Sequence, residues 1–292
     1  MVALAPSLGT APLLQRRASW REPSALPGFR GAFAFTLIYA GSIILLPLAA
    51  LVARPWEHSP GELLHGILQP RTLTALRLSF TAALAAALVN TVAGLAVAWV
   101  LSRYDFPGRR LVDALVDLPF ALPTAVAGIA LATLYGPNGW IGSLLAPLGV
   151  KVAFTPLGVF VALLAVGLPF VVRAVQPVLE DLDGALEEAA HTLGANTLQT
   201  FARVMLPALL PALLTGFSLA FARGAGEYGS VIFIAGNMPG VSEIAPLVIV
   251  TRLEAYDYAG AAAVGLTMLA ISLAVLVVTN WLQVRVARRG AS

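Results

Sequence analysis

Two charged side chains stand inside an otherwise uncharged stretch, "FARGAGEYGSVIFIAGN", at residues 221–237. Arg223 and Glu227 are four residues apart, so on a regular helix they share one face. A guanidinium there can supply positive potential along the path of an anion, and a neighbouring carboxylate can neutralise it. The residues leave two interpretations open: an ion pair that only holds packed helices together, or a charge that acts on an anionic substrate.

Other titratable residues lie at spacings that favour structural roles. Asp113 and Asp117 are four residues apart, and we expect them to complement a helix N-terminus because no partner for activating water is evident. His58 and His65 have glutamates nearby, but their spacing matches no closed set of metal ligands. The sequence therefore predicts no catalytic residue, no metal site and no cofactor.

The composition excludes several chemistries. The chain has no cysteine, which rules out disulfides, thiolate metal sites and a cysteine nucleophile. It also has no "GxxxxGK[ST]" phosphate-binding loop, so we expect any ATP to be hydrolysed by another subunit. Its basic residues are scattered in short clusters, which argues against nucleic acid as a partner. We predict a chain that is not itself an enzyme.

The elements that position these residues are membrane spans. Of 292 residues, 59% are hydrophobic and 11% are charged, whereas soluble domains carry ~25% charged residues. Uncharged stretches of about 20 residues are long enough to cross a membrane, and continuous apolarity favours helices over a barrel. We predict an all-α membrane protein with six transmembrane helices within residues 31–285. The six stretches are 31–53, 78–102, 118 to about 136, 152–172, 204–222 and 258–284. Prolines in three of them predict kinks: Pro119 and Pro123, Pro169 and Pro177, and Pro207 and Pro211.

The positive charges between these spans predict the orientation. Twelve of the 18 lysines and arginines, Arg173 among them, fall in connectors on one side. Five, including Arg71 and Arg77, fall in connectors on the other side, and Arg223 lies within a span. We therefore expect both termini to be cytoplasmic, with residues 1–30 as a disordered extension and 286–292 as a short tail. The arginines of the first 30 residues precede a long apolar run, which does not resemble a secretory signal.

The same spans place Arg223 deep in the membrane. On a regular helix it lies ~24 Å along the axis from Pro207, at a depth where ionisable groups normally face a bundle interior or an aqueous cavity. Gly224, Gly226 and Gly229 surround the charged pair. They predict a broken or bent helix that a neighbouring helix approaches closely.

One polar connector, "EEAAHTLGANTLQTFARVMLP" at residues 187–207, predicts two short helices joined at a corner. Apolar residues recur at helical spacing on both sides of Gly194, which suits a left-handed C-terminal cap. Asn196 and Gln199 fit an N-terminal capping box. Two apolar stripes must then be buried against a partner, and Glu187 and Glu188 argue against an anionic lipid surface. A protein partner on the cytoplasmic side fits better.

This connector resembles the EAA motif of binding-protein-dependent ABC transporter permeases. The matching residues are Glu188, Ala189, Ala190, Gly194, Val204, Leu206 and Pro207. The resemblance implies that residues 186–206 form coupling helices that dock on a cytoplasmic ATPase, present in two copies. It also implies a MetI-like permease fold and a place in the bacterial inner membrane.

The stretch at 221–237, with the continuation "IAPLVIVTRLEAYDYAGAAAVG", resembles sulfate/thiosulfate and molybdate permeases, the T-type sulfate permeases above all. The resemblance covers about residues 70–285, with 72–284 as the core permease. It implies a related W-type permease, a periplasmic sulfate-binding protein and membrane lipid as partners. The alternatives are a molybdate or tungstate permease that works as a homodimer, and an ion-coupled secondary transporter.

Overall fold

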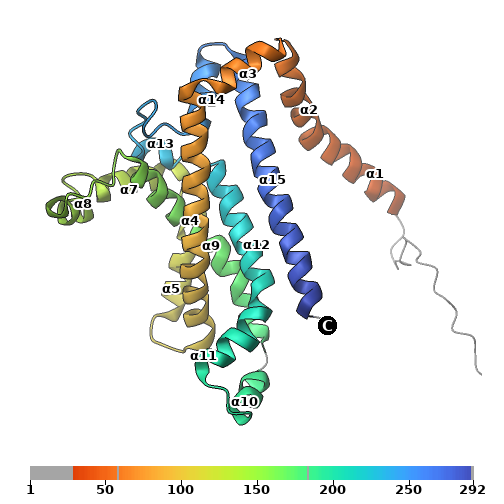
Figure 1. Ribbon diagram of the computed structural model, residues 1–292, viewed down its shortest axis with the longest axis vertical. Helices are drawn as coiled ribbons and strands as arrows, with labels where there is room; N and C mark the ends of the chain where they lie inside the picture. The colour runs from red at the N-terminus through yellow and green to blue at the C-terminus, as the bar shows by residue number, and fades with distance from the viewer. Residues whose placement is uncertain (1–28, 58, 183, 291–292) are drawn as a thin grey trace, which may run out of the picture. The chain divides into compact units, whose positions relative to one another are not determined.

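The computed structural model describes residues 29–57, 59–182 and 184–290, and all regular elements among them are helical (Figure 1). The chain divides into two compact units, residues 1–49 and 50–292. The first unit contains α1 (Phe29–Ala40), the π-helical turn η1 (Gly41–Leu45) and the start of α2 (Leu46–Ala53). The predicted extension at 1–30 lies almost entirely outside the described residues.

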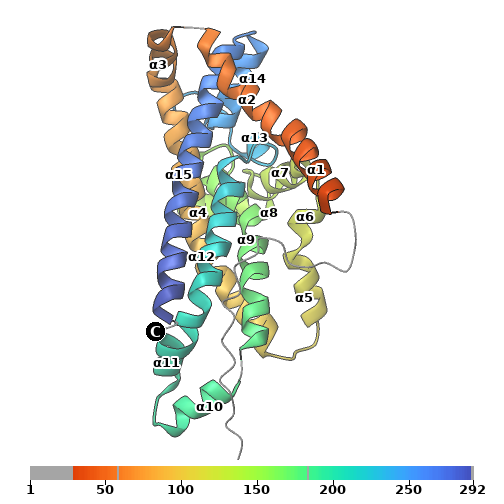
Figure 2. The ribbon, with the colours of Figure 1, turned by 90° about the vertical axis from the view of Figure 1, so that its right-hand side faces the viewer.

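The second unit holds the remaining helices. They are η2 (Arg54–Glu57), α3 (Pro60–Leu68), α4 (Pro70–Arg103), α5 (Arg109–Val116), α6 (Leu118–Ala121), α7 (Thr124–Tyr135), α8 (Trp140–Leu145), η3 (Ala146–Leu148), α9 (Pro156–Asp181), α10 (Gly184–Thr192), α11 (Thr197–Thr200), the π-helical η4 (Phe201–Met205), α12 (Leu206–Ala225), α13 (Val231–Ile234), α14 (Ala245–Glu254) and α15 (Tyr258–Gly290). Within this unit, α10 and α11 lie at one end of the long helices, and α3 and α14 lie at the other (Figures 1 and 2).

The core of the second unit forms where α4, α9 and α12 pack against one another. Small residues allow this close approach. A Cβ atom added at Gly94 of α4 would lie 2.7 Å from the Val171 side chain of α9, and one at Gly216 of α12 would lie 2.9 Å from the Val171 Cα atom. The helices therefore meet almost backbone to backbone around Val171.

Two buried polar side chains add interhelical hydrogen bonds to this packing. The amide of Asn90 on α4 donates to the Leu164 carbonyl oxygen of α9 at 3.1 Å. The Ser79 hydroxyl, also on α4, accepts from the Ala245 amide at 2.8 Å and so satisfies a backbone donor at the start of α14. Both side chains are fixed in the core because burial without a partner would be costly.

Five of the six predicted spans are confirmed as helices. Among the described residues, five helical stretches are long and apolar enough to cross a membrane: Gly31–Ala53, Pro70–Arg103, Pro156–Asp181, Thr197–Ala225 and Tyr258–Arg285. Four of them extend beyond the predicted bounds at one or both ends, because charged residues at a span's ends continue the helix instead of beginning a loop. Arg71, Arg77 and Arg173 therefore lie inside α4 and α9 and not in the predicted connectors.

The third predicted span, near 118–136, is not one long helix, and the kink expected at its prolines is a complete break. The chain forms α6 and α7 there, separated at Leu122 and Pro123. Leu122 is extended, with φ −84° and ψ 134°, which is the conformation that a following proline favours. Pro123 also has no N–H to continue the α6 hydrogen bonds. The prolines noted in the other spans behave differently: Pro169, Pro177 and Pro211 lie inside continuous α9 and α12.

Candidate functional site

The connector between α9 and α12 forms the corner that its sequence predicts; we call residues 184–205 the corner loop. Gly194 has a φ of +83°, the left-handed region that favours glycine. The Ala195 amide donates to the Ala190 carbonyl at 3.0 Å, which closes the end of α10. The Asn196 side chain and Gln199 form a reciprocal capping box at the start of α11, with bonds of 2.9 and 3.0 Å. The two short helices are therefore held at a defined angle.

Much of the apolar surface of the corner loop is uncovered. Leu193 is 88% exposed and Leu198 is 75% exposed. On the inner side, Met205 is buried and Phe201 is half-buried. Of the motif residues, Glu188, Ala189, Gly194 and Pro207 are exposed, Ala190 is buried, and Val204 and Leu206 are half-buried. The loop thus joins the bundle through one face and presents apolar side chains beside a carboxylate on the other.

The motif's final residues shape the entry to α12. Pro207 has no N–H, so it cannot donate to the Arg203 carbonyl as an ordinary helical residue would. The preceding amide, that of Leu206, donates to the Phe201 carbonyl five residues back, and residues 201–205 form a π-helical turn. Such turns are rare and are frequently found at functional sites.

Arg223 and Glu227 form an ion pair, but they do not share a helical face. The helix α12 ends at Ala225, and Glu227 lies in the turn that follows. Its carboxylate is almost fully buried, whereas the Arg223 side chain is 36% exposed. The Oε1 atom of Glu227 also accepts from the Ser230 amide and hydroxyl, both at 2.9 Å. The pair therefore fixes the turn from α12 to α13.

The predicted break of this helix is confirmed, and the predicted close approach holds at one glycine. A Cβ atom at Gly229 would lie 2.1 Å from the Thr124 hydroxyl of α7. At Gly224 it would make an ordinary contact of 3.5 Å with Ala83, and at Gly226 it would meet no atom within 4 Å. Of these three glycines, only Gly229 needs the absence of a side chain for packing.

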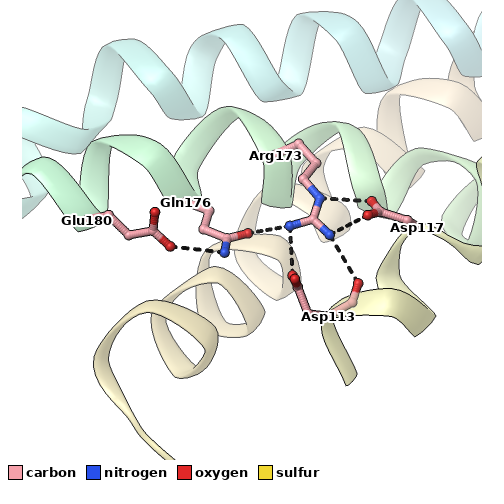
Figure 3. Close-up of polar contacts among 5 residues, drawn as sticks. All are labelled: Asp113, Asp117, Arg173, Gln176 and Glu180. Carbon is pink, nitrogen blue, oxygen red and sulfur yellow. Dashed lines mark hydrogen bonds and ion pairs between the residues drawn. The ribbon is translucent and has the colours of Figure 1, made fainter. Parts of the chain in front are cut away.

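A second charged cluster joins α5 to α9 around Arg173 (Figure 3). Its guanidinium donates to the Asp117 carboxylate at 2.8 and 2.6 Å, and to the Asp113 carboxylate and backbone carbonyl at 2.7 and 3.0 Å. A fifth bond of 2.6 Å goes to Gln176, which in turn donates to Glu180. All five N–H groups of Arg173 are engaged, so none is left for a substrate anion. Asp117 does stand at the N-terminus of α6, although its side chain caps no amide there. For Asp113, which lies inside α5, the expectation of complementing a helix N-terminus is wrong.

Replacing Arg173 by leucine is expected to loosen α5 from α9. The aspartates are 41% and 47% exposed, so water would hydrate them and the loss would be about 1 kcal/mol, or about 3 °C in Tm. Thermal unfolding of the purified chain measures it. The control is Arg109→Leu, which removes an ion pair with the 95% exposed Asp105 and should change Tm by less. Equal shifts of Tm in the two variants would contradict a role of Arg173 in holding α5 against α9.

Other ion pairs at the α3 and α14 end of the unit were not anticipated from the sequence. Arg71 binds the buried Glu243 carboxylate through two bonds of 2.8 and 2.6 Å. Arg252 pairs with Asp257 at 3.2 Å and donates to the Gly66 carbonyl at 2.9 Å. Arg71 and Glu243 are 172 residues apart, and no local pattern signals such a contact.

Among the described residues, no three histidine or acidic side chains gather where a metal ion could bind. His65 is exposed at the end of α3, while His58 lies outside the described residues. His191, in the corner loop, has its Nδ1 atom 3.1 Å from the Ala195 carbonyl oxygen. Arg71, Arg173 and Arg223 thus form ion pairs that join separate segments of the chain.

Comparison with known families decides what kind of bundle this is. The model of the family described as "Binding-protein-dependent transport system inner membrane component" matches residues 90–290, which include the whole corner loop. The chain belongs to this family. It is therefore a multi-pass membrane permease of the ABC transporter class, and the predicted all-α permease fold is confirmed.

Individual relatives of the chain are also named as transport permeases. The permease is 48% identical over 264 residues to the sulfate transport system permease protein CysT of Salmonella typhimurium, covering 90% of this chain and 95% of that protein. It is 50% identical over 252 residues to the CysT protein of Synechocystis sp., covering 85% and 87%.

Solved structures show the same fold. The permease matches a chain of a bacterial ABC transporter involved in the import of alginate with a TM-score of 0.73 and 16% identity, over 88% of this chain and 95% of that one. It matches a chain of the MetNI methionine ABC transporter with a TM-score of 0.53 and 18% identity, over 74% and 94%. At these identities the likeness concerns the fold alone.

Proposed function

We propose that this permease is the T-type transmembrane subunit of an ATP-driven importer that moves sulfate or thiosulfate across the bacterial inner membrane. The observation that carries the proposal is the corner loop, a rigid projection with exposed Leu193 and Leu198 beside an exposed Glu188. In the proposed mechanism this surface docks on a cytoplasmic ATPase subunit. ATP binding then moves the loop, and the loop moves the bundle between two conformations.

The motif residues have distinct proposed roles in this docking. Small Ala189 lets a partner surface approach closely, and Glu188 supplies a carboxylate for a basic side chain of the partner. The buried Ala190 packs inside the corner, and Gly194 keeps the corner rigid. Val204, Leu206 and Pro207 shape the π-helical turn through which movement enters α12.

The choice of sulfate rests on the relatives, whose printed names assign them to sulfate transport. The arginines inside this chain already have partners, which supports a role for other subunits in selecting the anion. The guanidinium of Arg173 is saturated, and Arg223 is paired with a buried carboxylate. We infer that a periplasmic binding protein and a related W-type permease supply much of the recognition. Molybdate, carried by a homodimer, is the alternative.

A reconstituted transporter tests the proposal. The permease would be co-expressed with its genomic neighbours, purified, and placed in lipid vesicles with ATP inside and radiolabelled sulfate and the binding protein outside. We expect sulfate uptake that requires ATP and two copies of an ATPase subunit. Uptake of molybdate but not sulfate would support the alternative.

The same vesicles distinguish an ion-coupled secondary transporter. Uptake that is driven by a proton or sodium gradient in the absence of any ATPase subunit would contradict an ATP-driven importer. Family membership favours the ATP-driven mechanism, since the matched region includes the corner loop.

A further inference from the structure

The last turn of α4 carries two side chains that reach both halves of the corner loop. Arg103, the final residue of α4, forms an ion pair with Glu187 of α10, with 2.7 Å between Nη2 and Oε1. One turn earlier, Trp99 meets Phe201 edge to face, with ring centroids 5.7 Å apart and planes at 71°. Phe201 is the first residue of η4. The segments before and after Gly194 are thus both held by one turn of a helix remote in sequence.

The two α4 side chains also support each other. Arg103 follows Trp99 by four residues, so both lie on one face of the helix. The guanidinium carbon is 5.9 Å from the centre of the indole ring, within the range of a cation–π interaction. The indole ring therefore holds the guanidinium in place for Glu187 and also contacts Phe201.

This ion pair differs from an ordinary surface pair, which contributes little. The two side chains are 25% and 31% exposed. The atoms that meet are shielded from solvent, and they attract by charge without the alignment of a hydrogen bond. Water screens such a contact less than a pair at the surface. By comparison, the nearby Asp105 and Arg109 pair lies largely in solvent.

Beyond the corner loop, α4 is part of the packed core. Gly94 lies against Val171 of α9, and Asn90 is hydrogen-bonded to the Leu164 carbonyl. A displacement of the end of α4 must therefore shift α9 as well, since close-packed helices do not deform independently. The covalent route from the loop into α12 instead passes through the π-helical turn of η4.

We propose that Arg103 and Trp99 are positioning residues through which the movement of the corner loop reaches α4 directly, in parallel with its covalent connection to α12. Glu187 and Phe201 are their contacts on the loop. The inference rests on the proposed function, because it takes the loop to be moved by an ATPase. It assigns the coupling to a second helix and to side chains outside the seven motif residues.

A charge exchange in the complete reconstituted transporter tests the link. Sulfate uptake and ATP hydrolysis are measured together for Glu187→Arg, for Arg103→Glu and for the double variant. We expect each single variant to lower the sulfate taken up per ATP about fivefold, in the range of ordinary coupling energies. ATPase subunits should still co-purify. The double variant restores the opposite charges and should recover at least half of the loss.

Three further variants separate coupling from folding. Arg103→Lys keeps the charge, so its sulfate uptake per ATP should stay near that of the wild type. Trp99→Leu keeps apolar bulk but removes the ring face, and it should lower the ratio. Asp105→Arg breaks the exposed neighbouring pair and should leave the ratio unchanged.

The inference would be overturned if Glu187→Arg and Arg103→Glu both took up as much sulfate per ATP as the wild type. It would also be overturned if the double variant took up no more sulfate per ATP than either single variant. A wild-type permease that retains no ATPase subunit would instead overturn the proposed function on which it rests. Because Arg103 lies on α4 and not on the docking surface, a loss in Arg103→Glu that Glu187→Arg repairs cannot come from altered docking.

Discussion

Gly194→Val is expected to abolish ATP-coupled transport while the chain still inserts into the membrane. With φ at +83°, a residue bearing a Cβ atom is strained by about 1–2 kcal/mol, and a β-branched residue by more. No atom lies within 4 Å of the added Cβ, so the loss would come from the changed angle of the corner and not from a clash. We expect uptake at least tenfold lower, measured in vesicles with ATP. Gly184→Val is a control in the same loop, because Gly184 is equally open and has no positive φ.

Glu188→Lys tests the same docking surface through charge. Glu188 is exposed, so reversing its charge should change the free energy of unfolding by less than about 0.5 kcal/mol. A loss of ATPase binding would then come from a lost contact with the ATPase subunit and not from unfolding of the permease. The matched control is Glu254→Lys, an exposed glutamate at the end of α14. Normal substrate-stimulated ATP hydrolysis in both Glu188→Lys and Gly194→Val would contradict the docking role.

The second large effect is expected at the Arg223 and Glu227 pair. Arg223→Ala leaves a carboxylate that is 1% exposed without its counter-ion, and removing one partner of a buried pair costs about 3 kcal/mol. For a chain of this size the cost corresponds to a fall of about 6–12 °C in Tm, measured by thermal unfolding of the purified complex. Arg77→Ala, at an exposed arginine of α4, is the control and should have little effect.

A double variant decides between the two interpretations of this pair. In Arg223→Leu with Glu227→Leu, no charge is left buried, and well-packed apolar residues often replace a buried pair without loss. The hydrogen bonds from Ser230 to Glu227 favour a structural role for the pair. We therefore expect the double variant to recover much of the thermal stability and of the transport that Arg223→Ala loses. Recovered stability with transport still absent would instead assign Arg223 to the anion path.

Several features could be predicted because their causes are local. Long uncharged stretches identify five of the six spans, since crossing a membrane demands about 20 apolar residues in sequence. The corner at Gly194 and the capping box at Asn196 follow from residue types within a few positions of one another. Pro123 predicts a kink, but whether a proline bends a helix or ends it depends on the packing around it: the helix breaks at Pro123 and continues through Pro169.

The charged contacts could not be predicted in the same way. The sequence places Arg173 in a connector and predicts that Asp113 and Asp117 complement a helix N-terminus, so it gives no sign that the three side chains meet. These residues meet because α5 packs beside α9 about 60 residues further on. The partners of Arg71 and Arg103 come from positions still further away in the chain. A periodic pattern within one helix carries no information about which other helix will lie against it.

The amino-acid sequence by itself determined that this protein is a helical membrane protein with a sharp corner between two of its long helices, since apolar length, a left-handed glycine and capping residues act within single segments of the chain. The tertiary structure alone decided which charges are neutralised and which helix end contacts the corner loop. Those contacts depend on the packing of α4, α9 and α12, where small residues let distant helices meet. Ion pairs form between side chains that packing brings within about 4 Å, whatever their separation in the chain.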